Sequence, residues 1–258
     1  MTAGKLIAGA GYRILSLGAL LLLWELCAFV AEPTPGLESR KLPGPFAVLQ
    51  ILVARLLDGS LPLDIGITLA RVAVSFALAM LIGVAIGIAM GRRPRLDRFF
   101  DGWLVLFLNI PALVTIVLCY VWFGLIEAAA IAAVALNKIP NVIVTLREGA
   151  RALNRDYLEM AEVFRLGRAK TLRHIVLPEL FPFIVAAARS GLALIWKIVL
   201  VVELLGRSNG VGFEIGIFFS LFDVAGIVAY TIAFAAVIQL IELALLRPLE
   251  RRANQWRR

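Results

Sequence analysis

Residues Ile67–Met90 read ITLARVAVSFALAMLIGVAIGIAM, and this apolar stretch contains a single charged side chain, Arg71. A helix needs roughly 20 apolar residues to cross the hydrocarbon core of a bilayer, so the stretch predicts a membrane-spanning helix. Of the 258 residues 61% are hydrophobic and only 17% are charged. A soluble domain is about half apolar and about a quarter charged, so the composition excludes a soluble globular protein. The scarcity of charge also excludes a disordered chain.

Five further stretches have the length and polarity of membrane spans. Together with the first they predict an all-α polytopic membrane protein with six transmembrane helices. The expected spans are Ile14–Ala31, Ile67–Met90, Trp103–Phe123, Leu125–Leu146, Phe183–Glu203 and Val224–Leu246. The first follows Lys5 and Arg13 as a signal peptide would, but it contains Glu25 and has no small-x-small cleavage site. We therefore expect a retained signal-anchor helix.

The distribution of positive charge predicts the orientation, because Lys and Arg in short loops stay on the cytoplasmic side. With the N-terminus inside, 18 Lys and Arg residues fall on inner segments. Four fall on outer segments, namely Arg40, Lys41, Arg55 and Arg207. Both termini are therefore expected to be cytoplasmic. This rule and the attraction of anionic head groups explain the net charge of +8, so the expected partner is membrane lipid and no nucleic acid.

Other residues limit the chemistry. Cys27 and Cys119 both lie in apolar runs, where we expect buried thiols without a disulfide. His174 is the only histidine, so a histidine metal cluster cannot form within one chain. On the outer side, apolar residues recur at helical spacing over residues 46–57 after a proline-rich entry. This pattern predicts an amphipathic helix lying on the outer surface.

The inner segment Arg147–Phe181 has the pattern of two short helices. Asp156 is expected to cap the first, because acidic residues complement a helix N-terminus. Gly167 is expected to allow a change of direction, and Leu177-Pro178 to stop the second helix before the next span. The apolar residues of the first helix recur at helical spacing: Tyr157, Met160, Ala161 and Phe164. Two interpretations are open on these grounds, a segment that docks into another protein and an interfacial helix that rests on lipid.

The spacing of Glu159-Met160-Ala161, Arg165, Ile175 and Leu177-Pro178 resembles the EAA signature of type-1 ABC importer permeases. That signature is Glu-Ala-Ala, three residues, Gly, nine residues, Ile, one residue, Leu-Pro, so Met160 and Arg165 depart from it. Further segments between Leu42 and Leu246 are similar to the nitrate, sulfonate, taurine and bicarbonate branch of these permeases. They are Leu42-Pro43-Gly44-Pro45, Pro111, Trp122-Phe123-Gly124, Arg189 with Glu203, Leu205-Gly206 and Gly210-Val211-Gly212.

The resemblance implies the type-1 (MetI-like) permease fold in a bacterial plasma, or inner, membrane. It implies a homodimer that works with two cytoplasmic ABC ATPase subunits, which bind ATP and Mg, and with a periplasmic or lipid-anchored solute-binding protein. The chain has no G-x-x-x-x-G-K-[ST] phosphate loop, so it is expected to be no enzyme and to hold no cofactor itself. An alternative is a six-span secondary transporter or channel that works without ATP.

The same resemblance divides the chain into three parts. Residues 1–60 are the expected signal-anchor helix and outer amphipathic segment, 61–250 the permease core, and 251–258 a basic cytoplasmic tail. The coupling loop lies at about 147–181 of the core. The residues expected to couple it to the ATPase are Glu159, Met160, Ala161, Glu162, Phe164, Arg165, Gly167, Leu177 and Pro178.

The substrate path is expected among polar groups in the spans, where an ionisable side chain costs roughly 2.5–3.5 kcal/mol and usually faces a partner or a wet cavity. Lys138 and Lys197 lie near the middle of their spans. Each either lines the path of a small anion or belongs to a structural ion pair, with Glu25 and Glu242 as available acids. Further candidates are Arg189, Asn109, Thr115, Ser190 and Glu203. For Arg189 and Glu203 a structural role, paired with groups on other helices, is the alternative.

The sequence also contains two patterns of glycine residues. Gly83, Gly87 and Gly91 recur every four residues and permit close helix contact, either within the chain or at a dimer face. The glycine-rich stretch Gly206–Asp223 is expected to be a wide outer loop that serves as a gate or contacts a binding protein.

Overall fold

The computed structural model describes residues 3–30, 42–246 and 248, and within these residues it contains helices and no strand. The chain divides into two compact units, each with its own internal contacts. The first unit consists of Met1–Ile65 with Glu214–Ala236, and the second of Gly66–Phe213 with Val237–Arg258. The expected basic tail at 251–258 and the outer cations Arg40 and Lys41 lie outside the described residues.

The first unit contains α1 (Ala3–Val30), α2 (Pro45–Leu57), the first turns of α3 (Ser60–Arg92) and most of α11 (Val224–Ile241). The Trp24 indole on α1 donates a hydrogen bond of 3.0 Å to the carbonyl oxygen of Pro43, just before α2. The Tyr230 hydroxyl donates to Asp64 at 3.2 Å and so links α11 to α3. The helix expected over residues 46–57 is confirmed as α2.

The start of α3 is stabilised by a local cap. Asp58 accepts hydrogen bonds from the backbone N–H of Ser60 at 2.8 Å and from its hydroxyl at 2.7 Å. Both bonds favour the charged carboxylate and hold the pKa of Asp58 below its ordinary value.

The prediction that Gly206–Asp223 is a wide loop is wrong in part, because Val211–Ser220 forms the short apolar helix α10.

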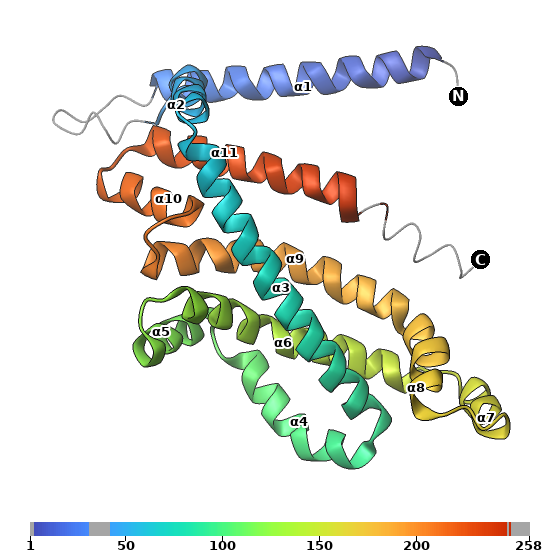
Figure 1. Cartoon of the computed structure of the whole chain (residues 1–258). Helices are drawn as coiled ribbons and strands as arrows, with labels where there is room; N and C mark the ends of the chain where they lie inside the picture. The colour runs from blue at the N-terminus through green and yellow to red at the C-terminus, as the bar shows by residue number, and fades with distance from the viewer. Residues whose placement is uncertain (1–2, 31–41, 247, 249–258) are drawn as a thin grey trace. The chain divides into compact units, whose positions relative to one another are not determined.

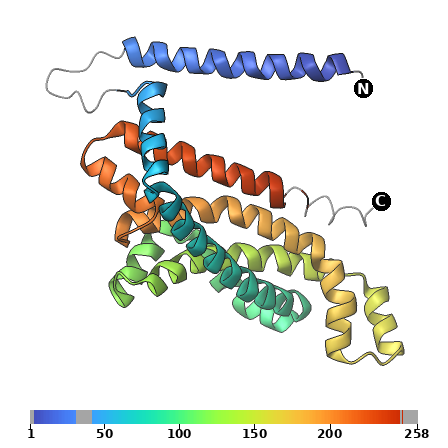
Figure 2. The ribbon, with the colours of Figure 1, turned by 45° about the horizontal axis from the view of Figure 1, so that its top comes forward.

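The second unit is built around α6 (Glu127–Arg151) and α9 (Leu177–Gly206), which lie side by side, with α3 crossing them (Figure 1; Figure 2). Around them are α4 (Pro94–Asn109), α5 (Ala112–Phe123), α7 (Arg155–Val163), α8 (Arg168–Thr171) and two π-helical turns, η2 (Leu172–Val176) and η3 (Glu242–Leu246). Their core is the buried cluster of Val142, Leu146, Ala150, Leu153, Val176, Leu180 and Ala187.

Glycines bring α3 directly against α6. A Cβ atom built on Gly83 would lie 2.6 Å from Cβ of Val142, and one on Gly87 would lie 2.7 Å from Cβ of Leu146. Gly91 meets Ala150 in the same way, at 2.6 Å. The side chains of α6 therefore occupy the space that a larger residue on α3 would need. Of the two interpretations of this spacing, the structure supports packing within the chain.

The prediction that the third span is a single helix is wrong. Residues Trp103–Phe123 fall on α4 and α5, whose axes are bent by 95° at the break. Ile110, which precedes Pro111, has an extended backbone with ψ of 124°. Proline lacks an amide hydrogen and pushes the preceding residue out of the helical region, which explains why the helix ends here.

Four helices of the described chain are long and apolar enough to cross a membrane, or five if α4 and α5 together count as one. The expected second, fourth, fifth and sixth spans fall on these four helices. The first expected span falls on α1 up to Val30, and its last residue lies outside the described part. Both cysteines are free thiols, but only Cys119 is buried. Cys27 is exposed, because it lies on a different face of α1 from the buried Ala28.

Candidate functional site

The first candidate site is the segment between α6 and α9. Its helix α7 begins after Asn154, whose extended backbone and side-chain oxygen make it the N-cap. This oxygen accepts a hydrogen bond of 2.9 Å from the amide of Asp156, and the Asn154 amide donates to Glu179 at 3.0 Å. The expectation that Asp156 is the cap is wrong, because Asp156 is already the second residue of the helix. Its charge still complements the helix N-terminus.

Helix α7 has two different faces. Leu158 packs against the core of the second unit and Ala161 is 2% exposed, so these two side chains hold α7 to the rest of the unit. Other positions of α7 and its C-cap carry apolar side chains that no side chain of the described residues covers. They are Tyr157, Met160, Val163 and Phe164, and the acidic residues Glu159 and Glu162 are also exposed. The expectation that Ala161 packs against a partner is therefore wrong, because its side chain is covered by this chain.

The turn after α7 forms at Arg165. This residue has a positive φ of 48°, in the left-handed region. The Arg165 amide donates to the carbonyl of Glu162 at 2.9 Å, and the Leu166 amide donates to that of Ala161 at 2.8 Å. These two bonds make a Schellman C-cap, in which the left-handed position is usually glycine. The expectation that Gly167 makes the bend is wrong, because Gly167 has a φ of −62° and serves as the residue before α8.

The chain from Arg168 to Gly206 is helical without interruption through α8, η2 and α9. The expected stop at Leu177-Pro178 is wrong, because Pro178 lies in the first turn of α9. Within this continuous helix, the π-helical turn η2 directly before Pro178 accommodates the proline ring. The helix bends in this region instead of ending (Figure 1; Figure 2).

A second polar site lies at the opposite end of α9. Glu203 is 0% exposed, and its carboxylate accepts hydrogen bonds from Thr68 at 2.9 Å, from Arg71 at 2.7 Å and from the Gly212 amide at 2.8 Å. Arg71 also binds Glu127 at 2.6 Å and 3.0 Å. The expectation that Glu203 lines the substrate path is wrong, because both of its oxygens are buried and bonded. We call the group Thr68, Arg71, Glu127 and Glu203 the polar clamp.

The two mid-span lysines lie in different surroundings. Lys138 is 2% exposed on α6, and its Cε lies 2.7 Å from a Cβ built on Gly191 of α9. No acidic side chain pairs with it among the residues that the structure describes. Lys197 is exposed on a face of α9 that also carries Ser190 and Leu194. Arg189 lies 3.9 Å from Glu242, so this acid pairs with Arg189 and with neither lysine.

One side of α6 carries a row of polar residues that the sequence did not predict, with Asn141 exposed and Asn137 and Thr145 half-buried. Asn137, Asn141 and Thr145 recur every four residues, and each bonds a carbonyl one turn earlier, at 2.9, 3.4 and 3.1 Å respectively. In the sequence, the regular spacing of three polar residues in an apolar span could have revealed this row.

Asn109 is exposed beside the break between α4 and α5, and Thr115 is half-buried on α5. Within the described residues, no group of His, Cys, Asp and Glu gathers to hold a metal ion.

Comparison with known proteins places these features in context. Residues 79–254 match the family model of the binding-protein-dependent transport system inner membrane component. The taurine transport system permease protein TauC of Escherichia coli (strain K12) is 27% identical over 246 residues, which cover 93% of this chain and 88% of TauC. The putative aliphatic sulfonates transport permease protein SsuC of Bacillus subtilis (strain 168) is 29% identical over 216 residues, which cover 84% of this chain and 78% of SsuC.

A solved structure has the same fold. The MetNI methionine ABC transporter, in an inward-facing conformation, contains a chain that aligns with a TM-score of 0.63 and 18% identity. The alignment covers 72% of this chain and 94% of that chain. At this identity the likeness establishes the helical architecture and leaves the solute open.

Proposed function

The chain belongs to the family of inner membrane components of binding-protein-dependent transport systems, and from this premise we propose that it forms, as a homodimer, the translocation path of an ATP-driven importer. The ATP and Mg would be bound by two separate cytoplasmic ATPase subunits, and the solute would be delivered by a binding protein on the outer side. The proposal rests on the exposed apolar face of α7, because such a face outside the spans needs a protein partner or a lipid surface to cover it.

The charge of α7 favours the protein partner. Its sequence contains Arg155 together with Asp156, Glu159 and Glu162, so the helix carries a net charge of −2. The inner surface of a membrane is itself anionic and attracts basic segments. An acidic helix with Met160 and Phe164 exposed at 43% and 71% is therefore better matched to a groove in another protein. We assign that groove to the ATPase, with Glu159 and Arg165 in polar contacts at its edge.

A substitution in α7 tests this assignment. The double variant Met160→Ser/Phe164→Ser removes apolar area from the docking face without touching the core. We expect it to insert normally and to lose the ATPase in co-purification and in transport-linked ATP hydrolysis. The matched control is Phe219→Ser/Leu221→Ser, two side chains exposed at 67% and 65% far from α7 in the sequence, which should keep the ATPase. Equal co-purification of both variants would show that α7 is not the docking element.

The alternative of a transporter without ATP makes a different prediction. Such a protein would co-purify with no ATPase and would move solute in vesicles that contain no nucleotide. It also gives no reason for the exposed face of α7. Uptake that requires the ATPase and ATP would exclude it.

The substrate path is proposed along the exposed face of α9, with Lys197 and Ser190, and along the polar row of α6. In a homodimer each of these faces occurs twice, so two Lys197 ammonium groups would favour a small anion. The names of TauC and SsuC, which refer to taurine and aliphatic sulfonates, agree with an anionic solute. Lys138 and Glu203 are assigned to the interior of the fold, and Arg189 to its ion pair with Glu242.

A further inference from the structure

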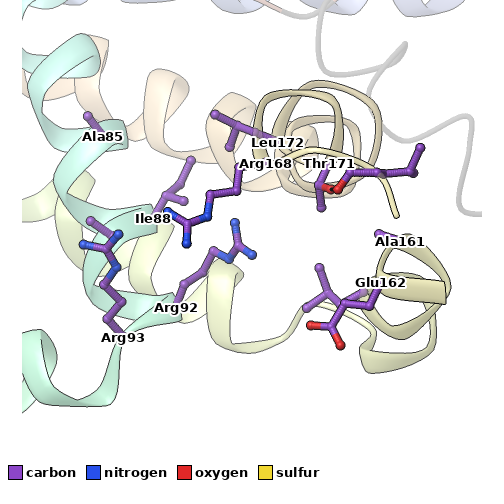
Figure 3. A pocket seen from close by; sticks show the side chains of 12 residues that line it. Ala85, Ile88, Arg92, Arg93, Ala161, Glu162, Arg168, Thr171 and Leu172 are labelled. Atoms are coloured by element: carbon purple, nitrogen blue, oxygen red, sulfur yellow. Dashed lines mark hydrogen bonds between the residues drawn. The ribbon is translucent and has the colours of Figure 1, made fainter. Parts of the chain in front are cut away.

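A pocket of about 610 Å³ lies where the inner end of α3 meets α7 and α8. Its cationic wall is formed by Arg92 at the end of α3, by Arg93 just before α4, and by Arg168 from α8. Figure 3 shows the side chains of Arg92 and Arg168 extending toward one another, with Arg93 beside the end of α3 and Glu162 on the facing wall. The pocket therefore has three guanidinium groups and one carboxylate, an excess charge of +2.

These arginines differ from others at the same end of the unit. Arg147 pairs with Asp101 at 2.5 Å and Arg151 pairs with Glu148 at 2.9 Å, and both also bind Asp97. By contrast, within the described residues none of the pocket arginines has a carboxylate partner or a side-chain hydrogen bond. Guanidinium groups that line one pocket and are bonded to no carboxylate repel one another, and an anion between them removes that repulsion.

The rest of the pocket is apolar. Ala85, Ile88 and Ala89 from the last turns of α3 line it together with Leu158 and Leu172. Because α3 is a membrane-length helix that ends at Arg92, this wall continues from the hydrocarbon core to the level of the head groups. A pocket with a basic rim and an apolar wall at this level matches the head group and upper chain of an anionic lipid.

We propose that this pocket binds a phosphate-bearing anion. Arginine is suited to the task, because its planar guanidinium binds two phosphate oxygens at once. The two walls belong to different elements, so the bound anion bridges the inner end of α3 and the α7–α8 turn. The site itself is independent of the proposed function. Its consequence for coupling rests on that function, because the anion would fix the position of the helix that is proposed to dock into the ATPase.

The test is a binding measurement on the purified full-length chain in a zwitterionic detergent. One arm titrates phosphatidylglycerol and the other titrates inorganic phosphate, and bound lipid is counted by native mass spectrometry. The variant Arg92→Gln/Arg93→Gln/Arg168→Gln removes the three pocket charges. The control Arg95→Gln/Arg98→Gln/Arg173→Gln removes three exposed charges that do not line the pocket. Neither measurement needs an ATPase or transport, so failure here is separate from failure of the proposed function.

We expect the pocket variant to bind phosphatidylglycerol about tenfold more weakly than the unmodified chain, while the control changes less than about twofold. A loss confined to the lipid arm identifies a lipid head group, and a loss in both arms identifies the phosphate group alone; both support the proposal. Equal weakening in the two variants would overturn it, because binding would then follow net charge. Unchanged binding of both anions by the pocket variant would also overturn it, because the three arginines would then not hold the anion. The single variant Arg168→Gln provides the same test if the triple variant does not fold.

Discussion

Arg71 donates a hydrogen bond of 2.7 Å to Glu203, and the two side chains are 4% and 0% exposed. The pair joins α3 to α9, and Glu127 on the same arginine adds α6. A buried ion pair is sensitive to the loss of one partner, because the other charge is then left in a medium of low dielectric constant. The polar clamp is therefore the part of the second unit most sensitive to a change of charge.

Glu203→Ala should lower the free energy of unfolding by about 3–5 kcal/mol, because Arg71 would keep only part of its countercharge. Glu203→Gln retains an acceptor for Thr68 and should be less damaging. Thermal unfolding of the purified chain in detergent measures both. Glu242→Ala is the control, since its contact with Arg189 is 3.9 Å long and partly exposed, and it should change stability by less than about 1 kcal/mol. A similar loss in all three variants would contradict the assignment.

The close contact of α3 with α6 predicts opposite effects for two glycines of the same helix. Gly83→Ala places a Cβ 2.6 Å from Val142 and should destabilise the chain by about 1–3 kcal/mol. Gly66→Ala meets no atom within 4 Å and should stabilise it by about 0.5–1 kcal/mol. The midpoint of thermal unfolding distinguishes the two. If both substitutions were tolerated equally, the helices would be farther apart than the structure places them.

The C-cap of α7 predicts that glycine is better than arginine at position 165. Arg165→Gly removes the strain of a left-handed side-chain-bearing residue and should stabilise the chain by about 1 kcal/mol. Gly167→Ala should be tolerated, because the backbone there is extended and an added Cβ meets no atom within 4 Å. Proteolysis of the α7–α8 turn, followed over time, reports the local effect. If Arg165→Gly were cleaved faster than Gly167→Ala, the assignment of the bend to Arg165 would be wrong.

Lys138→Met should stabilise the protein and leave uptake intact. The lysine is buried without an acidic partner in the described chain, and a charge in a span costs about 2.5–3.5 kcal/mol on insertion scales. A methionine of similar length fills the same space beside Gly191. A higher unfolding temperature with normal solute uptake is the expected result. Abolished uptake would instead return Lys138 to the substrate path.

Lys197→Met should abolish uptake of an anionic solute without a change in stability. The side chain is exposed on α9 and makes no hydrogen bond or ion pair within the described residues, so its replacement should leave the fold intact. Radiolabelled uptake into vesicles that contain the assembled transporter measures the effect. Lys197→Arg keeps the charge and should retain part of the activity. Unchanged uptake by Lys197→Met would remove this residue from the path.

The sequence predicted the helical class and most of the spans, because apolar length alone determines which segments can cross a bilayer. It did not predict which prolines break a helix. Pro140 and Pro182 lie inside α6 and α9, whereas the chain turns by 95° at Pro111. The difference depends on whether neighbouring groups satisfy the carbonyls that a proline leaves free, and this is a property of the packed structure.

The sequence also did not predict which face of each span is buried. Lys138 and Lys197 occupy similar mid-span positions, yet one is buried and the other exposed. In a helix of a soluble protein the polar side chains mark the exposed face, but the buried and the lipid-facing sides of a membrane helix are both apolar. The segment with the EAA spacing lies between α6 and α9, and its role in coupling stays a prediction. The cap at Asn154 and the turn at Arg165 required backbone angles, which no residue pattern supplied here.

The unbroken helix from Arg168 to Gly206 has a mechanical consequence. One end carries the turn next to α7, and the other end carries Glu203, which is anchored to α3 and α6. A push applied to α7 is transmitted through residues that are all helical, and the π-helical turn η2, where the helix bends, is the place where it can flex. The end of α9 that carries Glu203 then acts as the fixed point, and the opposite end must swing about it or flex at η2. Lys197 lies six residues from Glu203, so a wide movement of the opposite end would displace its side chain only slightly.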